Sequence, residues 1–182
     1  MGNFNNVESV TGIMEYYDTL AAGYDELHGE EQRRKLAILK DYLKPHDDAL
    51  LLDVGCGTGM SSDIFNCRII GIDNSQAMLR EGKRKERNNA DYLRGKGENL
   101  PFKDRVFDHV ISVTALHNFT DPKRALGEIK RVCRKNGAVT VLKKAKGARD
   151  LEALVDEVLG ITDLVDGDFD RLLFFNIQTP PQ

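Results

Sequence analysis

Residues 50–59 read LLLDVGCGTG, and residues 69–73 read IIGID. In the first stretch, an apolar run ends in Asp53 and then in a turn with a glycine at every second position. This pattern is typical of a buried strand that leads into a backbone turn where side chains would obstruct a ligand. The second stretch predicts another buried strand, ending in Asp73, an acid placed to accept hydrogen bonds from ribose hydroxyls. Together they predict a pocket for an adenosine-containing cofactor.

The spacing of the glycines narrows the choice of cofactor. The turn carries Gly55, Gly57 and Gly59, whereas dinucleotide sites use G-x-G-x-x-G, and Met60 occupies the third glycine's position here. No Lys-Ser or Lys-Thr pair follows a glycine turn, so the phosphate-binding pattern G-x-x-x-x-G-K-[ST] is also absent. Two interpretations remain, a nucleoside cofactor and a generic strand–turn–helix with a tight glycine corner.

Length and composition predict one globular domain over residues 1–182. Charged residues make up 30% of the chain and hydrophobic residues 41%, and no apolar run approaches the roughly 20 residues of a membrane-spanning helix. The first ten residues lack the pattern of a secretory signal. The three cysteines (Cys56, Cys67, Cys133) are odd in number and widely spaced, which indicates neither a disulfide framework nor a zinc site. We therefore expect a cytoplasmic location and no metal.

After residue 48 the predicted strands and helices alternate. Strands are expected over residues 49–54, 68–73, 91–94, 107–114 and 138–142, and the intervening and following helices over residues 60–65, 75–87, 121–136 and 150–160. Cys133 would then lie on the apolar face of the third of these helices, and Asp150 would cap the last one. Residues 161–165 and 171–177 predict a hairpin, and residues 13–27 and 31–43 predict N-terminal helices. The alternation predicts an α/β fold with a doubly wound, mostly parallel seven-stranded sheet and a C-terminal antiparallel hairpin.

The glycine turn with its preceding acid resembles motif I of the class I S-adenosylmethionine-dependent methyltransferases. Three further segments resemble the methyltransferase type 11 group, which includes ubiquinone and menaquinone biosynthesis enzymes: YYDTLAAGYDEL (16–27), ENLPFKDRVFDHVIS (98–112) and ALHNFTDPKRALGEIKRVCRKNGAV (115–139). The likeness implies a Rossmann-like methyltransferase fold, with residues 1–47 as a helical lid and residues 48–182 as the cofactor-binding core. Its motifs are specific to cofactor and fold, not to substrate.

The same resemblance implies S-adenosyl-L-methionine as the cofactor. The turn would lie against the methionine part, Asp53 would orient the turn, and Asp73 would hold the ribose. The implied cofactor-binding residues are Tyr17, Tyr24, Asp53, Gly55, Cys56, Gly57, Gly59, Asp73, Asn74, Gly97, Glu98 and Thr114. One position departs from the family: Lys96 stands where relatives commonly have an acid that accepts the adenine amino group, and lysine has no acceptor. Glu98, a backbone carbonyl, or stacking together with the Gly97 N–H would then hold the adenine.

The methyl acceptor is expected beyond the C-terminal strand ends, near residues 114–118. His117 is the candidate general base, because its pKa suits neutral pH. The alternative is that His117 lines the pocket at the start of a helix and transfers no proton. Neither Asp-Pro-Pro-Tyr nor Asn-Pro-Pro-Tyr follows the strand at residues 107–114, so the grip on planar amines that these motifs provide is not supported.

The leading hypothesis is a methyltransferase that acts on a small molecule. The net charge of −3 gives no overall attraction to nucleic acid, although basic residues cluster at residues 80–87, 123–135 and 143–149. Solvated helix faces are the preferred interpretation of these clusters. A tRNA-modifying methyltransferase is the alternative that they motivate. Lys96 and the small size motivate a third hypothesis, a non-catalytic cofactor-binding or partner-docking module. The sequence leaves the oligomeric state open.

Overall fold

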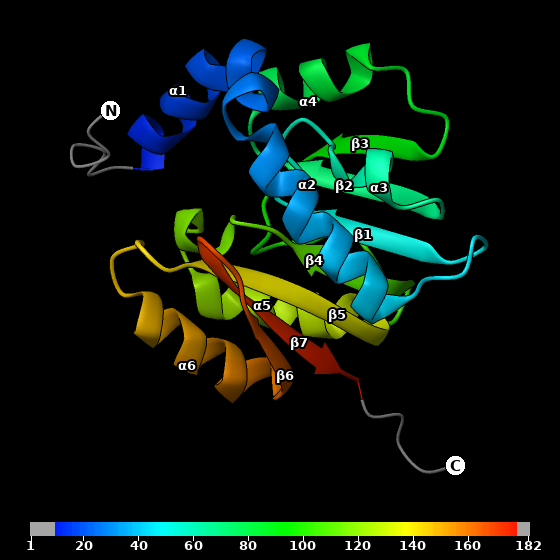
Figure 1. Cartoon of the computed structure of the whole chain (residues 1–182), viewed down its shortest axis with the longest axis vertical. Helices are drawn as coiled ribbons and strands as arrows, with labels where there is room; N and C mark the ends of the chain where they lie inside the picture. Colours follow the sequence, from blue (N-terminus) through cyan, green and yellow to red (C-terminus); the bar gives the residue numbers. More distant parts are fainter. Residues whose placement is uncertain (1–9, 178–182) are drawn as a thin grey trace.

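The structure is a computed structural model that describes residues 10–177. Within these residues, seven strands form one sheet in the order β3-β2-β1-β4-β5-β7-β6 (Figure 1). The strands are β1 (Leu50–Val54), β2 (Arg68–Asp73), β3 (Ala90–Arg94), β4 (Phe107–Ser112), β5 (Cys133–Leu142), β6 (Ile161–Asp166) and β7 (Asp170–Asn176). Strands β1 to β5 pair in parallel, and β7 is antiparallel to both β5 and β6. The predicted mostly parallel sheet with an antiparallel hairpin is confirmed.

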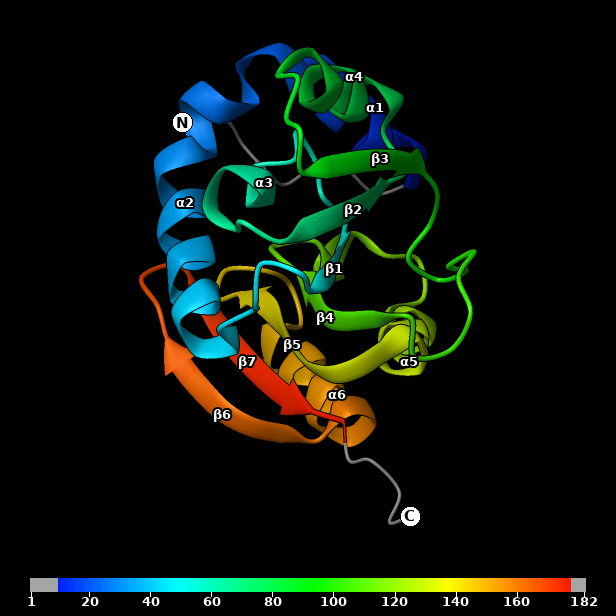
Figure 2. The ribbon, with the colours of Figure 1, turned by 90° about the vertical axis from the view of Figure 1, so that its right-hand side faces the viewer.

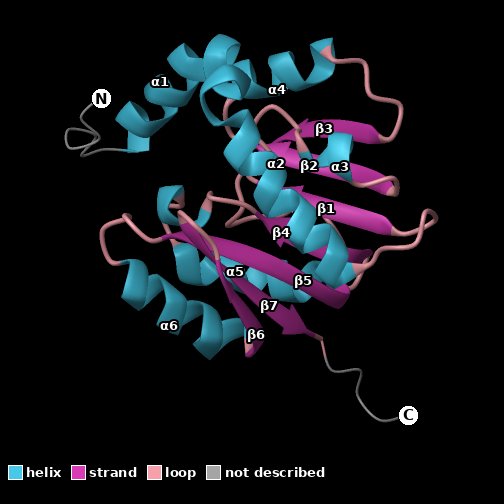
Figure 3. Ribbon diagram, in the orientation of Figure 1, coloured by secondary structure: helices cyan, strands magenta, loops and turns pink. Residues whose placement is uncertain are grey.

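Helices cover both faces of this sheet (Figure 2). They are α1 (Val10–Leu20), α2 (Tyr24–Leu43), α3 (Ser61–Ile64), α4 (Gln76–Arg84), α5 (Pro122–Val132) and α6 (Ala148–Leu159), with 3₁₀ turns η1 (Ala21–Gly23) and η2 (Leu116–Asn118). Helices α2 and α3 lie on one face, and α5 and α6 on the other (Figure 3). Successive residues of β1 therefore enter opposite cores: Leu51 packs in the cluster that contains Leu39 of α2, and Leu52 in the cluster that contains Ile129 of α5.

The boundary between α5 and β5 differs from the prediction. Asn136-Gly137 was expected to stop the helix, but α5 ends at Val132, and β5 already begins at Cys133. Cys133 pairs with Phe107 of β4, and the register of the two strands shifts between Phe107 and His109. Cys133 is therefore a fully buried strand residue and does not lie on a helix face. Pairing with β4 decides this boundary over local helix signals.

The N-terminal helices also divide at a different place. The sequence predicted a break around residues 28–30, but the chain turns at η1, and α2 runs without interruption for 20 residues. The prediction that Asp150 caps α6 was wrong as well. Gly147, with φ 73°, precedes the helix, and its carbonyl accepts the Leu151 N–H at 2.9 Å, whereas Asp150 lies inside the first turn.

Within residues 10–177, no helix has the length and apolar character needed to cross a membrane. The same residues contain no cluster of three or more histidine, cysteine or acidic side chains able to hold a metal ion. Cys56, Cys67 and Cys133 are all buried free thiols.

Candidate cofactor-binding site

A cavity lies at the carboxyl ends of β1, β2 and β4, bordered by residues of α1 and α2. The predicted site residues that line it are Tyr17, Tyr24, Gly55, Gly57, Asp73, Asn74, Gly97, Glu98 and Thr114. The predicted residues outside its lining are Asp53, Cys56, Gly59 and His117. The cavity is further lined by residues that the sequence did not predict as cofactor contacts, among them Ser75, Met78, Ala115, Asn118 and Phe119. The fold thus brings most of the predicted set together.

Gly55 forms the part of the turn that follows β1. Its φ is +77°, and a Cβ atom at this position would lie 2.5 Å from Cβ of Ala115. The Gly55 N–H donates to the carbonyl oxygen of Ile72 at 2.8 Å, which ties the turn to β2. A side chain at residue 55 is therefore excluded twice, by the left-handed backbone and by the close approach of the chain after β4. Bare backbone faces the cavity as a result.

Asp73 connects the glycine turn to helix α4. Its Oδ2 accepts the Gly57 N–H at 2.8 Å, and its Oδ1 accepts the Ser75 N–H at 2.8 Å. Ser75 in turn caps α4, because its Oγ accepts the Met78 N–H at 3.1 Å. Burial raises the pKa of Asp73, and the backbone N–H groups that it accepts act in the opposite direction. The backbone N–H of Asn74 binds the same carboxylate. A carboxylate offers about four acceptor positions, so these three bonds still leave capacity for a ribose hydroxyl.

Asp53 is buried, with 4% of its surface exposed, and its Oδ1 has no hydrogen-bond partner among the described residues. Burial raises the pKa of Asp53 to about 7. Its charge is therefore costly in this position. Any effect that Asp53 has on a ligand would act through the turn, because the residue does not line the cavity.

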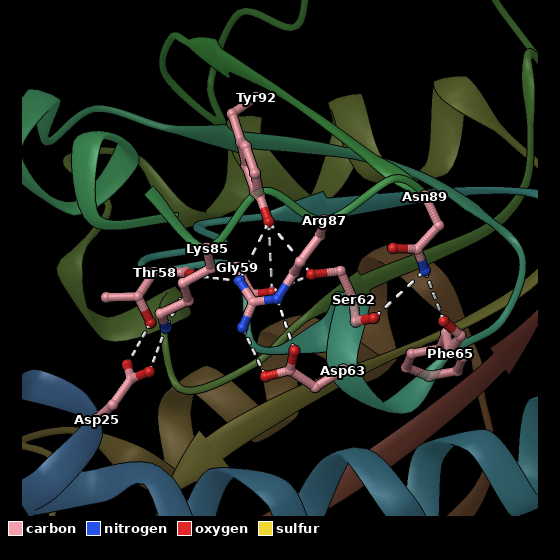
Figure 4. Close-up of polar contacts among 10 residues, drawn as sticks. All are labelled: Asp25, Thr58, Gly59, Ser62, Asp63, Phe65, Lys85, Arg87, Asn89 and Tyr92. Atoms are coloured by element: carbon pink, nitrogen blue, oxygen red, sulfur yellow. Dashed lines mark hydrogen bonds and ion pairs between the residues drawn. The ribbon is translucent and has the colours of Figure 1, made fainter. Parts of the chain in front are cut away.

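Residues from β3 and the segment before it support the glycine turn from outside the cavity (Figure 4). Arg87 donates to the carbonyl oxygen of Thr58 at 3.0 Å and forms an ion pair with Asp63 at 2.5 Å. Tyr92 lies so close to Gly59 that a Cβ there would be 2.1 Å from the tyrosine oxygen. The basic cluster at residues 80–87 was interpreted as a solvated helix face. That interpretation is wrong for Arg87, whose side chain is only 9% exposed.

The tyrosines of α1 and α2 face the cavity. The rings of Tyr17 and Tyr24 have centroids 6.3 Å apart, and both line the cavity. The Tyr17 hydroxyl accepts a hydrogen bond from Nδ2 of Asn118 at 3.0 Å. This bond joins α1 to the segment after β4 and closes the cavity at that end.

The aspartates that follow these tyrosines bind the core instead. Asp18 accepts a hydrogen bond from the Ser75 hydroxyl at 2.5 Å. Asp25 accepts one from the Thr58 hydroxyl at 2.5 Å and forms an ion pair with Lys85 (Figure 4). Each Tyr-Asp pair therefore supplies one residue to the cavity and one anchor to the structure around it.

The segment after β3 contributes Lys96, Gly97 and Glu98 to the lining of the cavity. The Glu98 carboxylate is already engaged, because Oε1 accepts the backbone N–H of Thr120 at 2.8 Å. Gly97 is buried, and a Cβ there would lie 3.0 Å from the ring of Phe119. Gly97 and the Phe119 ring thus lie together in one apolar wall of the cavity.

His117 lies beside the cavity, between the lining residues Ala115 and Asn118. Its Nδ1 is buried without a hydrogen-bond partner among the described residues. Burial lowers the pKa of His117, nearby Asp170 raises it, and nearby Lys35 lowers it. The imidazole is therefore neutral at pH 7, which is the protonation state a general base requires.

Comparisons with known proteins agree with this geometry. A family model described as a methyltransferase domain matches residues 52–141. The uncharacterized protein MJ1252 of Methanocaldococcus jannaschii is 38% identical over 128 residues, covering 69% of this chain and 49% of that protein. A demethylmenaquinone methyltransferase of Renibacterium salmoninarum is 33% identical over 132 residues, covering 69% of this chain and 55% of the enzyme. The chain thus spans about half the length of the curated relatives it matches.

A solved structure supports the fold. One chain of the complex between the Haloferax volcanii Trm112 methyltransferase activator and a methyltransferase superposes with a TM-score of 0.71. The match covers 90% of this chain and 98% of that chain at 19% sequence identity. The shared architecture therefore extends well beyond the segment matched by the family model.

Proposed function

Because this chain belongs to the class I S-adenosylmethionine-dependent methyltransferases, we propose that it transfers the methyl group of that cofactor to a small-molecule acceptor. The single observation that supports this most is Asp73. Its carboxylate ties the glycine turn to α4 and still has acceptor capacity toward the cavity. The name of the Renibacterium relative, a demethylmenaquinone methyltransferase, supports a small-molecule acceptor.

The residues of the cavity suit the parts of such a cofactor. Bare backbone at Gly55 and Gly57 would lie against the amino-acid part, and Asp73 would accept the ribose hydroxyls. The wall formed by Gly97 and Phe119 would stack on the adenine. Binding of the adenine in this way does not require an acidic residue at position 96. When bound, S-adenosylmethionine supplies an activated methyl group on a sulfonium. The protein's main task is then to align the acceptor within about 3–3.5 Å of the reacting carbon.

The acceptor would lie on the side of Tyr17 and Asn118, where the lid meets the segment after β4. Tyr17 and Tyr24 would exclude water from this side of the cavity. An acceptor that carries a proton on its nucleophilic atom would lose it to His117, whose buried Nδ1 has no hydrogen-bond partner among the described residues and accepts in the tautomer protonated on Nε2. His117→Asn should then slow methyl transfer to such an acceptor and leave cofactor affinity within about twofold.

Calorimetry with S-adenosylmethionine and S-adenosylhomocysteine tests the proposal. Wild-type protein should bind both, and Asp73→Ala should weaken both by about 100-fold, because it removes the ribose acceptor and loosens the turn. Asp91→Ala is the matched control: this aspartate lies in β3, and its ion pair with Arg68 is exposed. If the wild-type protein binds neither compound, the proposal fails.

A screen of metabolites with a labelled methyl donor would identify the acceptor. The same screen separates the enzyme from a non-catalytic cofactor-binding module, because a docking module would bind the cofactor and label nothing. Labelled tRNA in place of a labelled metabolite would favour the tRNA-modifying alternative.

A further inference from the structure

Thr114 has a backbone conformation that its side chain disfavours. Its φ is +55°, in the left-handed region, where a β-branched residue is rare and costs about 1–3 kcal/mol. It lies just beyond the carboxyl end of β4 and lines the cofactor cavity. Such a conformation persists only where the surrounding structure holds it in place.

A buried polar network provides that hold. The Thr140 hydroxyl oxygen, from β5, accepts the Thr114 N–H at 2.8 Å. Asp170, at the start of β7, accepts both hydroxyls on its Oδ2, from Thr114 at 2.8 Å and from Thr140 at 2.7 Å. Thr140 and Asp170 are almost completely buried. Both the amide and the hydroxyl of Thr114 are therefore fixed by groups on neighbouring strands.

Helix α2 of the lid joins the same network through Lys35. The Lys35 ammonium forms an ion pair with Asp170 at 2.7 Å and donates to the Thr114 hydroxyl at 2.9 Å. It also contacts Glu31, one turn earlier in α2, at 2.5 Å. The side chains of Lys35 and Asp170 are 6% and 0% exposed. A buried ion pair gains little net stability because of its desolvation cost, so a role in fixing one conformation is the better explanation of its presence.

The conformation of Thr114 determines where the next residue lies. Ala115 follows directly, and its Cβ occupies the space that a side chain at Gly55 would need. The 3₁₀ turn η2 begins at Leu116 and carries His117 and Asn118. The network thus sets the distance between the two walls of the cavity, the glycine turn and the segment after β4.

We propose that Asp170 is a positioning residue for the cofactor site: it holds Thr114 in the left-handed conformation, and Lys35 makes this hold depend on the position of lid helix α2. Its consequence for the cofactor rests on the proposed function. Asp170 itself does not line the cofactor cavity, so it acts only through Thr114. The same network makes docking of α2 and formation of the cavity wall one coupled event.

Two paired variants of the chain test this role without leaving a buried charge unpaired. Asp170→Ala with Lys35→Met removes the ion pair and the acceptor for both hydroxyls. Asp170→Asn with Lys35→Met removes the ion pair but keeps an oxygen that can accept from the hydroxyls. We expect the first pair to weaken binding of S-adenosylmethionine at least about tenfold, and the second to stay within about threefold of wild type. Equal affinities for the two folded variants would overturn the proposal.

A double-mutant cycle with Thr114→Gly identifies the route of the effect. Glycine adopts a positive φ without strain, so the wall no longer needs Asp170 to hold it. The combination of Asp170→Ala with Lys35→Met, here called the Ala–Met pair, should then change cofactor affinity by less than about twofold in the Thr114→Gly background. An unchanged tenfold effect would mean that Asp170 acts elsewhere.

Amide hydrogen exchange gives a readout that needs no cofactor. In the Ala–Met pair the amides of residues 113–118 should exchange at least about tenfold faster than in wild type, whereas those of residues 50–54 should be unchanged. Wild-type protein that binds no cofactor but shows this pattern would refute the proposed function and support the positioning role. Unchanged exchange at residues 113–118 would refute the positioning role whatever the cofactor does.

Discussion

Gly55 is the residue at which the site depends most on a missing side chain. Gly55→Ala places a methyl group 2.5 Å from Cβ of Ala115 and forces an L-residue to φ +77°. The two penalties together should destabilise the fold by about 2–5 kcal/mol and abolish cofactor binding. Urea unfolding and calorimetry measure the two effects.

Gly127→Ala is the control for this substitution. Gly127 lies exposed in the middle of α5, and a Cβ there would meet nothing within 4 Å. That change should stabilise the protein by about 0.5–1 kcal/mol. A Gly55→Ala protein as stable as the Gly127→Ala protein would contradict the close approach at the turn.

Asp53 should make stability depend on pH. Burial raises its pKa to about 7, so between about pH 4 and 7 the folded protein keeps a proton that the unfolded chain has lost. Stability contributed by this group therefore falls as pH rises through that range and is constant above it. Between pH 4 and 8, the free energy of unfolding of Asp53→Asn should therefore rise relative to that of wild type by a few kcal/mol, in order of magnitude.

Urea unfolding of both proteins at several pH values measures this gain. His117, whose pKa burial lowers, contributes equally to both proteins, so the difference between them isolates Asp53. Parallel stability curves would show that Asp53 carries no such shift.

Among single residues, the sequence predicted those whose position follows from the end of one strand. Gly55 and Asp73 follow directly from the ends of β1 and β2, and both line the cavity. Arg87 and Asp170 were missed, because their contacts with Thr58 and Thr114 cross 29 and 56 residues of chain. Such pairs depend on which strands are neighbours, and the spacing of residues in one segment does not contain that information.

The anchors of the predicted lid are features of whole elements, because they determine how α1 and α2 sit on the core. Asp18→Asn combined with Asp25→Asn weakens the contacts with Ser75, Thr58 and Lys85. Each contact is partly exposed and worth at most about 1 kcal/mol, so the fold should persist while the lid opens more often. The cofactor should then dissociate about 3–10 times faster.

Stopped-flow displacement of the cofactor measures this rate. Asp41→Asn is the control, because Asp41 is exposed on α2, far in sequence from these anchors. Added salt should screen the ion pair between Asp25 and Lys85. The rate at which the cofactor dissociates should therefore rise in wild type and change less in the double variant. Equal dissociation rates would show that the aspartates do not hold the lid.

The ends of elements were predicted less well than their type. The sequence places helical residues before Asn136, yet β5 starts at Cys133 because that residue pairs with Phe107. Arg131 explains why α5 can end without a glycine: its carbonyl oxygen accepts the Arg105 N–H at 2.9 Å. A partner that lies outside the helix thus replaces a local stop signal.

For the whole molecule, alternation of strand and helix was sufficient to predict the sheet, because parallel strands need crossover connections. The acceptor was not predictable in the same way. The residues that would contact it, such as Tyr17 and Asn118, come from opposite parts of the chain and meet only through the fold.

The distribution of charge over the molecule bears on the tRNA alternative. Members of all three basic clusters form ion pairs with acidic residues. The pairs are Arg84–Glu81, Lys85–Asp25, Arg87–Asp63, Lys123–Glu157, Arg131–Glu128, Arg134–Asp108, Lys135–Asp108 and Lys143–Asp166. These carboxylates neutralise much of the positive charge that would otherwise attract a phosphate backbone.

We therefore expect weak tRNA binding with a shallow dependence on salt. A protein that neutralises many phosphates loses affinity steeply as salt rises, by about 0.9 log units per contact and tenfold increase in salt on a duplex. Filter binding across salt concentrations should give a slope corresponding to fewer than about two contacts.

Asp108→Asn is the informative variant. Burial raises the pKa of Asp108, but Arg134, Lys135 and the Leu50 N–H outweigh this and hold it well below its usual range, so the carboxylate is charged at pH 7. Its loss should release Arg134 and Lys135 and steepen the slope, whereas a steep slope already in wild type would favour tRNA as the substrate.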